Sequence, residues 1–148
     1  MRTPLIVVKR REDWVTRFLE CVDKFADVKM QYGSFDCCLG GVALVEAMTG
    51  VDLAADFRGY NQRKKAYSRI ARFGGLLGAV EEVARQHDIP EIPVTHAQRG
   101  DVLVVELALG KALAVVDLTG QGVLIPYGRG FRRLPFEAVS LIKAWRIS

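Results

Sequence analysis

The sequence predicts an α+β fold in which N-terminal helices pack on a C-terminal antiparallel β-sheet. Before residue 90, apolar residues recur at spacings of three and four, which is typical of amphipathic helices. After residue 100, runs rich in valine, leucine and isoleucine are separated by glycine-containing turns, which is typical of strands. Helices first and strands second favour segregated layers.

Length and composition indicate one domain covering residues 1–148. The chain is half hydrophobic and a quarter charged, and this length suffices for a compact core. We expect residues 11–90 to be mainly helical and residues 100–148 mainly β. No apolar run approaches the roughly 20 residues of a membrane span, and the run Leu5-Ile6-Val7-Val8 is too short for a signal peptide. We expect residues 1–10 to form an N-terminal arm or edge strand that pairs with another subunit.

Four helices are expected in the first half. The first lies within residues 11–29, where Cys21 falls on the apolar face as a core residue. The second begins at Asp36, whose carboxylate suits an N-cap, and ends at Gly50. The third covers the basic residues 58–72. The fourth opens after Gly74-Gly75, and Pro90 and Pro93 end the helical half.

Five strands are expected in the second half. The first three are joined by tight turns, because Gly110 and the pair Thr119-Gly120 separate them. A short helical turn over residues 135–139 precedes the last strand. The expected strands cover residues 101–107, 112–118, 121–126, 131–134 and 141–147.

The pair Cys37-Cys38 is the strongest candidate for chemistry. It follows the polar turn that ends at Asp36 and opens the second helix. Unpaired N–H groups and the positive end of the helix dipole favour a thiolate there, so we expect the pKa of Cys37 to fall below its free value of about 8.5. Cys37 is therefore the candidate nucleophile. The plainer interpretation makes Asp36 only an N-cap and Cys38 a small core residue.

Two motifs carry a resemblance to a known family. Asp36-Cys37 at a helix start, and Gly100-Asp101 leading into an apolar strand, resemble the NlpC-type cell-wall peptidases, a papain-like cysteine peptidase family. More narrowly, three segments look like a small domain of unknown function found among tail-assembly genes of tailed phages and prophages. These segments are residues 35–39, residues 50–59 without Leu53, and residues 98–101.

The sequence departs from the peptidase pattern at two of three catalytic positions. The resemblance implies a catalytic histidine at the start of the strand after Gly110, where this chain has Ala112. It also implies a polar residue that orients the histidine near Ile125-Pro126. Without a base, attack and leaving-group protonation lose factors of roughly 100 to 10,000.

Three other residues are candidates for the missing base. His96 precedes the Gly-Asp strand and is the weak candidate, whereas His87 suits a helix-terminal cation better. Lys111 would act as a base only if buried.

A basic stripe is the other candidate surface. Arg63, Lys65, Arg69 and Arg72 recur near helical spacing and would contact an acidic partner or phosphates, although a solvated helix face is the simpler interpretation. We expect no metal, since three cysteines and two histidines lack the spacing of a zinc site, and no cofactor.

Three functions follow, in order of preference. The first is a structural component of a phage tail, at the tip or hub, with a degenerate NlpC-like fold that docks other tail proteins. The second is an active cysteine hydrolase that cuts peptide bonds of bacterial peptidoglycan with Cys37. The third is a nucleic-acid-binding module. The resemblance implies location in the virion after assembly in the bacterial cytoplasm.

Overall fold

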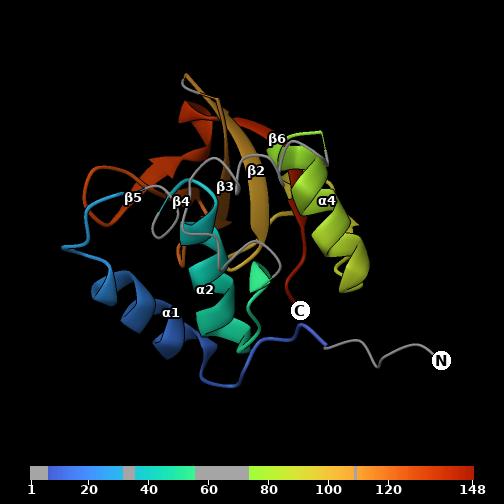
Figure 1. Ribbon diagram of the computed structural model, residues 1–148, viewed down its shortest axis with the longest axis horizontal. Coiled ribbons are helices and arrows are strands. Elements are labelled where there is room, and N and C mark those ends of the chain that lie inside the picture. Colours follow the sequence, from blue (N-terminus) through green and yellow to red (C-terminus); the bar gives the residue numbers. More distant parts are fainter. Residues whose placement is uncertain (1–6, 32–35, 56–73, 109) are drawn as a thin grey trace.

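The computed structural model describes residues 7–31, 36–55, 74–108 and 110–148 (Figure 1). Three helices come first in the described chain, and all six strands of its sheet follow them. The predicted α+β fold is confirmed. No helix in the described ranges has the length and apolarity to cross a membrane. The helices are α1 (Trp14–Lys24), α2 (Leu39–Thr49) and α4 (Leu76–Gln86).

The strands form one antiparallel sheet in the order β1-β6-β2-β3-β4-β5. Two short 3₁₀ helices, η2 (Val94–His96) and η3 (Phe136–Ala138), precede β2 and β6. The strands are β1 (Glu91–Ile92), β2 (Val102–Leu107), β3 (Gly110–Val116), β4 (Gly122–Pro126), β5 (Phe131–Pro135) and β6 (Ser140–Trp145).

Most predicted elements are present, with shifted ends. The first helix is shorter than the predicted window, because the chain leaves the helix at Phe25 and then pairs with the β4–β5 hairpin through Met30 N–H to Gly128 C=O, 2.7 Å. The five predicted strands correspond to β2–β6, whereas β1 was not predicted. The predicted third helix, residues 58–72, lies outside the described residues.

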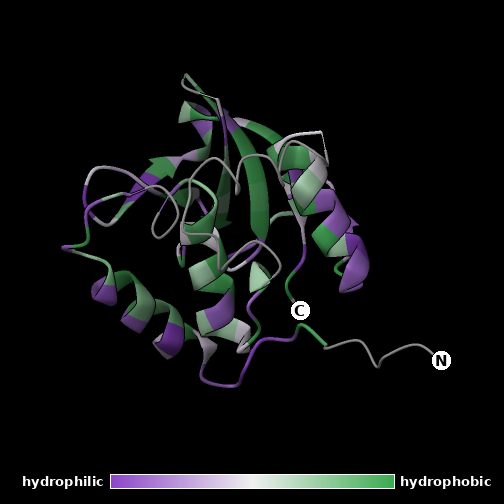
Figure 2. Cartoon of the chain, viewed as in Figure 1, coloured by the Kyte–Doolittle hydropathy of each residue, from purple (hydrophilic) through white to green (hydrophobic). Residues whose placement is uncertain are grey.

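Both faces of the sheet are buried, which explains the nearly continuous apolar runs of β2 and β3. Alternate residues, such as Val104 and Leu113, face the helices and pack with Phe18 and Leu44. Their neighbours form a second cluster on the opposite face: Leu103, Val105, Ala112, Ala114, Val116, Val123, Ile125 and Ala144. In Figure 2, β2 is hydrophobic along most of its length, whereas α4 carries hydrophilic residues on one side. This opposite-face cluster lies next to the start of α2.

The N-terminal segment folds partly onto its own chain. Val8 is buried in the core on the helix-facing side, and Arg10 N–H donates to the carbonyl of Ser148. Val7, in contrast, is 76% exposed. The predicted partner-pairing role is therefore wrong for Val8, and residues 1–6 lie outside the described part of the chain.

A buried carboxylate fixes the β3–β4 turn. Asp117 accepts a hydrogen bond from Thr119 Oγ1 at 2.7 Å and forms an ion pair with Arg133 of β5. Burial raises the pKa of Asp117, but the hydrogen bonds from Thr119 and Arg133 outweigh it, so the net pKa lies below the ordinary value. Asp117 is therefore ionised and paired at neutral pH.

We expect Asp117→Asn to lower the free energy of unfolding at neutral pH by about 1–2 kcal/mol, near the low end for a hydrogen bond to a charged group, because the Arg133 side chain is 43% exposed. A folded-state pKa below the unfolded one adds stability above the unfolded pKa of about 3.9. That stability is lost as the pH falls through the folded pKa. Urea titrations from pH 7 down to pH 2 check this, since the difference between variant and wild type should shrink below pH 4. A pH-independent difference would contradict it.

Candidate functional site

Asp36 caps the start of α2, as predicted. Its Oδ1 accepts hydrogen bonds from the backbone N–H groups of Cys38 at 3.0 Å and Leu39 at 2.8 Å. Its carbonyl accepts the N–H of Gly40 at 3.0 Å. The helix proper begins at Leu39 and not at Asp36, so Cys37 lies in the capping turn that precedes it.

This turn occupies a split in the sheet. Within the described strands, β3 pairs with β4 only at Val115–Leu124 and Val116–Val123. Nearer the start of β3, Leu113 donates its backbone N–H to the carbonyl of Cys37 at 2.8 Å. The α2 capping turn thus takes over a backbone hydrogen bond of β3, which holds Cys37 beside the strand.

Two glycines allow helix α2 to lie this close to the sheet. A Cβ atom at Gly40 would overlap Cγ of Pro126 and lie 3.0 Å from its Cδ. A Cβ at Gly41 would lie 2.9 Å from Cγ of Leu113. Real Cβ atoms do not approach other carbon atoms so closely, so a larger residue at either position would force its neighbours to shift. The pair Gly40-Gly41 therefore positions Cys37 between β3 and β4.

The expected activation of Cys37 is wrong. Burial raises the pKa of the Cys37 thiol, and the negative charge of Asp36 raises it further, against a smaller lowering by a backbone hydrogen bond. The capping carboxylate therefore opposes the helix dipole at the sulfur. Because the thiol also packs against the opposite-face cluster, it is a neutral, partly buried group at neutral pH.

Ala112, at the position where the resemblance implies a histidine, lies in the same side-chain cluster as Cys37. Ala112 precedes Leu113, the residue whose N–H bonds to Cys37, and its side chain is 2% exposed in the same cluster. Ile125, at the position expected for the orienting residue, is also buried in this cluster. The structure thus brings together the three positions that the resemblance singles out, and two of them carry hydrocarbon side chains.

His96 lies near the Asp101 end of β2. The guanidinium of Arg146 donates to the carbonyl of His96 at 2.8 Å and also contacts Asp101, just before β2. Cys37 lies instead beside Leu113, the partner of Val104 in β2. Asp101 and Val104 are three residues apart in an extended chain, which corresponds to about 10 Å. His96 is also exposed, and its role as the base stays a prediction.

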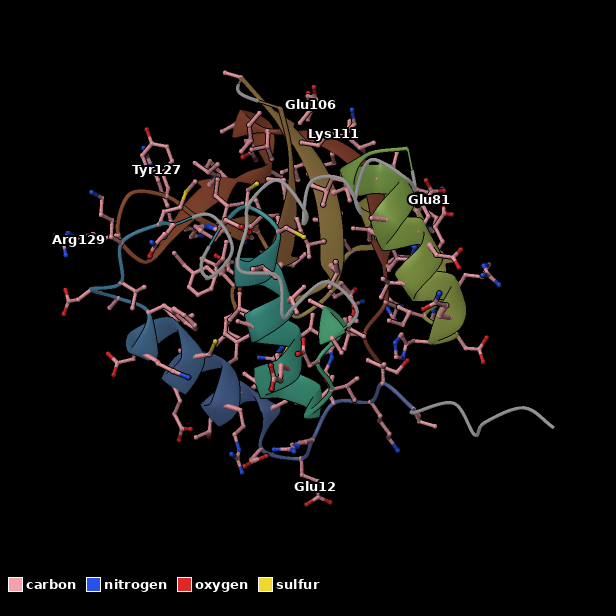
Figure 3. All side chains as sticks on the ribbon, in the orientation of Figure 1. Glu12, Glu81, Glu106, Lys111, Tyr127 and Arg129 are labelled. Atoms are coloured by element: carbon pink, nitrogen blue, oxygen red, sulfur yellow. The ribbon has the colours of Figure 1, made fainter. Side chains whose placement is uncertain are left out.

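The other two candidate bases, His87 and Lys111, lie in other parts of the structure. His87 is the C-cap of α4, in agreement with the helix-terminal interpretation. Lys111 is exposed and forms an ion pair with Glu106 at 3.4 Å across the β2–β3 hairpin, where Figure 3 shows the two side chains together. It is not the buried lysine that base catalysis would require.

Comparison with protein families places this chain in one family. A family profile described as "Domain of unknown function (DUF6950)" matches residues 9–147. The chain belongs to the DUF6950 family. A comparison with curated proteins gives no match.

The DUF6950 domain has one polar centre that sequence reasoning missed as a structural unit. Asp101 is fully buried and accepts hydrogen bonds from the N–H groups of Gln98 at 2.9 Å and Ile147 at 3.1 Å. The guanidinium groups of Arg10 and Arg146 lie 3.3 and 3.4 Å from its two oxygens. Only the Gly100-Asp101 motif signalled this centre, and its partners are separated by up to 91 residues of sequence.

Two further predictions concern the basic stripe as a binding surface and the expected lack of a metal site. Residues 63–72, which include Arg63, Lys65, Arg69 and Arg72, lie outside the described residues. Within the described ranges, no group of three or more histidine, cysteine or acidic side chains is placed to hold a metal ion.

Proposed function

We propose that this DUF6950 domain is a non-catalytic papain-like module that serves as a structural component of a phage tail, at the tip or hub. One observation carries the non-catalytic part of the proposal: Ala112, and not a histidine, lies near Cys37 at the expected position. A cysteine peptidase needs a thiolate and a positioned acid–base group. Here the thiol has a raised pKa, and a buried alanine occupies the expected histidine position.

Three features of the site support the papain-like part of the proposal. Cys37 opens a helix, its carbonyl bonds to the strand that follows Gly110, and Ala112 lies on that strand. These are the relations that the resemblance implies between nucleophile and histidine. The phage-tail part depends on the resemblance of residues 35–39, 50–59 and 98–101 to the tail-associated domain. Other tail proteins are then the partners, and the virion is the location.

The proposal predicts that Cys37 is alkylated slowly and that its alkylation needs a high pH. We expect the rate of modification by iodoacetamide to rise with pH with a midpoint above the free-thiol value of about 8.5, because burial and Asp36 both oppose ionisation. Mass spectrometry of digested protein measures the rate at each cysteine. Cys37→Ala and Cys38→Ala are the controls that assign the signal. A midpoint well below 8.5 would contradict the proposal and favour the hydrolase.

A hydrolysis assay tests the same proposal directly. We expect purified peptidoglycan to release no more soluble peptide with the wild-type domain than with Cys37→Ala. Release that depends on Cys37 would overturn the non-catalytic role. Mass spectrometry of purified particles from the phage or prophage that encodes the chain tests the tail role, and absence of the chain from those particles would overturn that part.

A further inference from the structure

Three arginines meet around one tryptophan and one carboxylate on the side of the domain away from Cys37. The guanidinium carbon of Arg10 lies 4.5 Å from the ring centroid of Trp14, and that of Arg99 lies 5.3 Å from it. Arg146 joins them through Asp101. We call these residues the arginine cluster: Arg10, Trp14, Arg99, Asp101 and Arg146.

The chain brings these residues together by a constrained turn. Gly100 has φ +85°, and a Cβ there would lie 3.1 Å from the Trp14 ring and 3.2 Å from Cζ of Arg10. The backbone therefore approaches both side chains more closely than another residue would allow. This approach places Arg99 on the tryptophan and Asp101 beneath Arg10. Figure 1 shows the C-terminal end of the chain beside the segment that leads into α1.

The cluster holds more positive than negative charge. Asp101 is the one carboxylate that pairs with these arginines in the described part of the chain. The backbone N–H groups of Gln98 and Ile147 also donate hydrogen bonds to its oxygens. Two guanidinium groups, those of Arg10 and Arg146, thus share one fully buried carboxylate, and a third, that of Arg99, lies over the Trp14 ring beside Arg10. Burial lowers the pKa of Arg10 most, the charge of Asp101 raises it, and the charges of Arg146 and Arg99 each lower it further, so both of these cations repel Arg10. Holding like charges together costs folding energy that a bound anion would recover.

Part of this charge is available to solvent. Arg99 is exposed, and its one contact recorded among the described residues is the ring of Trp14. The Arg146 side chain is 35% exposed. A planar guanidinium stacked on an aromatic ring is preorganised and keeps its N–H groups free for carboxylate or phosphate oxygens. Arg99 is therefore the residue best placed to contact a ligand.

The surroundings favour a short acidic segment over a nucleic acid. Glu12 and Asp13 follow the pair Arg10-Arg11, and Glu12 projects to solvent at the lower edge of Figure 3. On the other side, Arg146 N–H bonds to the carbonyl of Pro90, which lies between Asp88 and Glu91. Acidic residues thus follow the cluster on both sides. A continuous phosphate backbone would meet them, whereas one or two carboxylates would not.

We propose that the arginine cluster is a docking site for an acidic segment of a partner protein, with Arg99 as its principal contact. The site is separate from Cys37, and it stands whether or not the domain is a tail protein. It gives the interaction role a location and a partner chemistry. Aromatic residues and arginine are also the residue types that contribute most to protein interfaces.

The test uses a fluorescein-labelled peptide of four glutamates, with binding followed by fluorescence polarisation at low salt. We expect Arg99→Gln to weaken binding about tenfold, the loss of about 1.4 kcal/mol from one charge pair. The matched control is Arg132→Gln, since Arg132 also stacks on an exposed aromatic ring, Tyr127, at 4.8 Å. Its effect should stay below about twofold if the site is local.

A structural role for Arg99 is excluded by a second readout. Because Arg99 repels Arg10 and stacks on Trp14, we expect Arg99→Gln to change Tm by no more than about 2 °C. Loss of peptide binding at unchanged Tm supports the docking site. Equal loss in Arg99→Gln and Arg132→Gln would overturn it, as would absence of binding by the wild type. Tighter, Arg99-dependent binding of an oligothymidylate would overturn the acidic-protein assignment, and tighter binding of citrate would assign the site to a small anion.

Discussion

Replacing Asp101 with alanine should lower the free energy of unfolding by about 3 kcal/mol. Removing one member of a buried ion pair leaves its partners uncompensated, and such changes cost about 3–5 kcal/mol. Here the Arg10 and Arg146 side chains are 19% and 35% exposed, so they regain some hydration and the lower end of this range applies. The N–H groups of Gln98 and Ile147 also lose their acceptor. Urea denaturation measures the loss.

Two further variants separate charge from hydrogen bonding at Asp101. Asp101→Asn keeps an oxygen for the Ile147 N–H but presents an amide group to donors, so we expect a loss close to that of the alanine variant. Asp13→Ala is the control, because Asp13, just before α1, forms an exposed ion pair with Arg17, so its loss should lower the free energy of unfolding far less. Equal losses at Asp13 and Asp101 would contradict the central role of Asp101.

Most helices and strands of this fold are predictable from local patterns, because the spacing of apolar residues in each one reflects which of its faces is buried. Trp14, Phe18 and Cys21 follow the helical period, and Phe18 and Cys21 are buried in α1. Asp36 caps the next helix, as its position predicts. Strand β1 escaped prediction because two residues, Glu91 and Ile92, carry no period. Its pairing with β6 depends on chain segments more than 50 residues apart.

The candidate site was predictable in its position but not in its electrostatics. The motif around Cys37 and the position of Ala112 come from the order of residues along the chain, and the structure brings both together beside Leu113. The sequence predicts a lowered pKa for Cys37 from the helix dipole, whereas burial and the charge of Asp36 raise this pKa. Burial follows from the split between β3 and β4, which no local pattern records. The wrong expectation for the thiol has this cause.

Gly40→Ala should destabilise the domain by about 1–3 kcal/mol, although the same change normally stabilises a helix. Alanine is about 1 kcal/mol better than glycine within a helix. Here the new methyl group would overlap the ring of Pro126 and lie 3.3 Å from Cε1 of Phe131. Overpacking of this kind costs about 1–3 kcal/mol, and a proline ring cannot rotate away. The sign of the measured change therefore reports whether α2 lies in the sheet as closely as the structure shows.

A double-mutant cycle with Pro126→Ala identifies the cause of that loss. Pro126→Ala removes the atoms that meet the new methyl group, so the double variant should be more stable than the sum of the two single changes predicts. Glu46→Ala, at an exposed position of α2, controls for helix propensity and should stay within about 0.5 kcal/mol. Because Gly40 also holds Cys37 against Leu113, Gly40→Ala should speed alkylation of Cys37 by iodoacetamide. A stabilising Gly40→Ala with unchanged alkylation would mean that α2 does not occupy the split between β3 and β4.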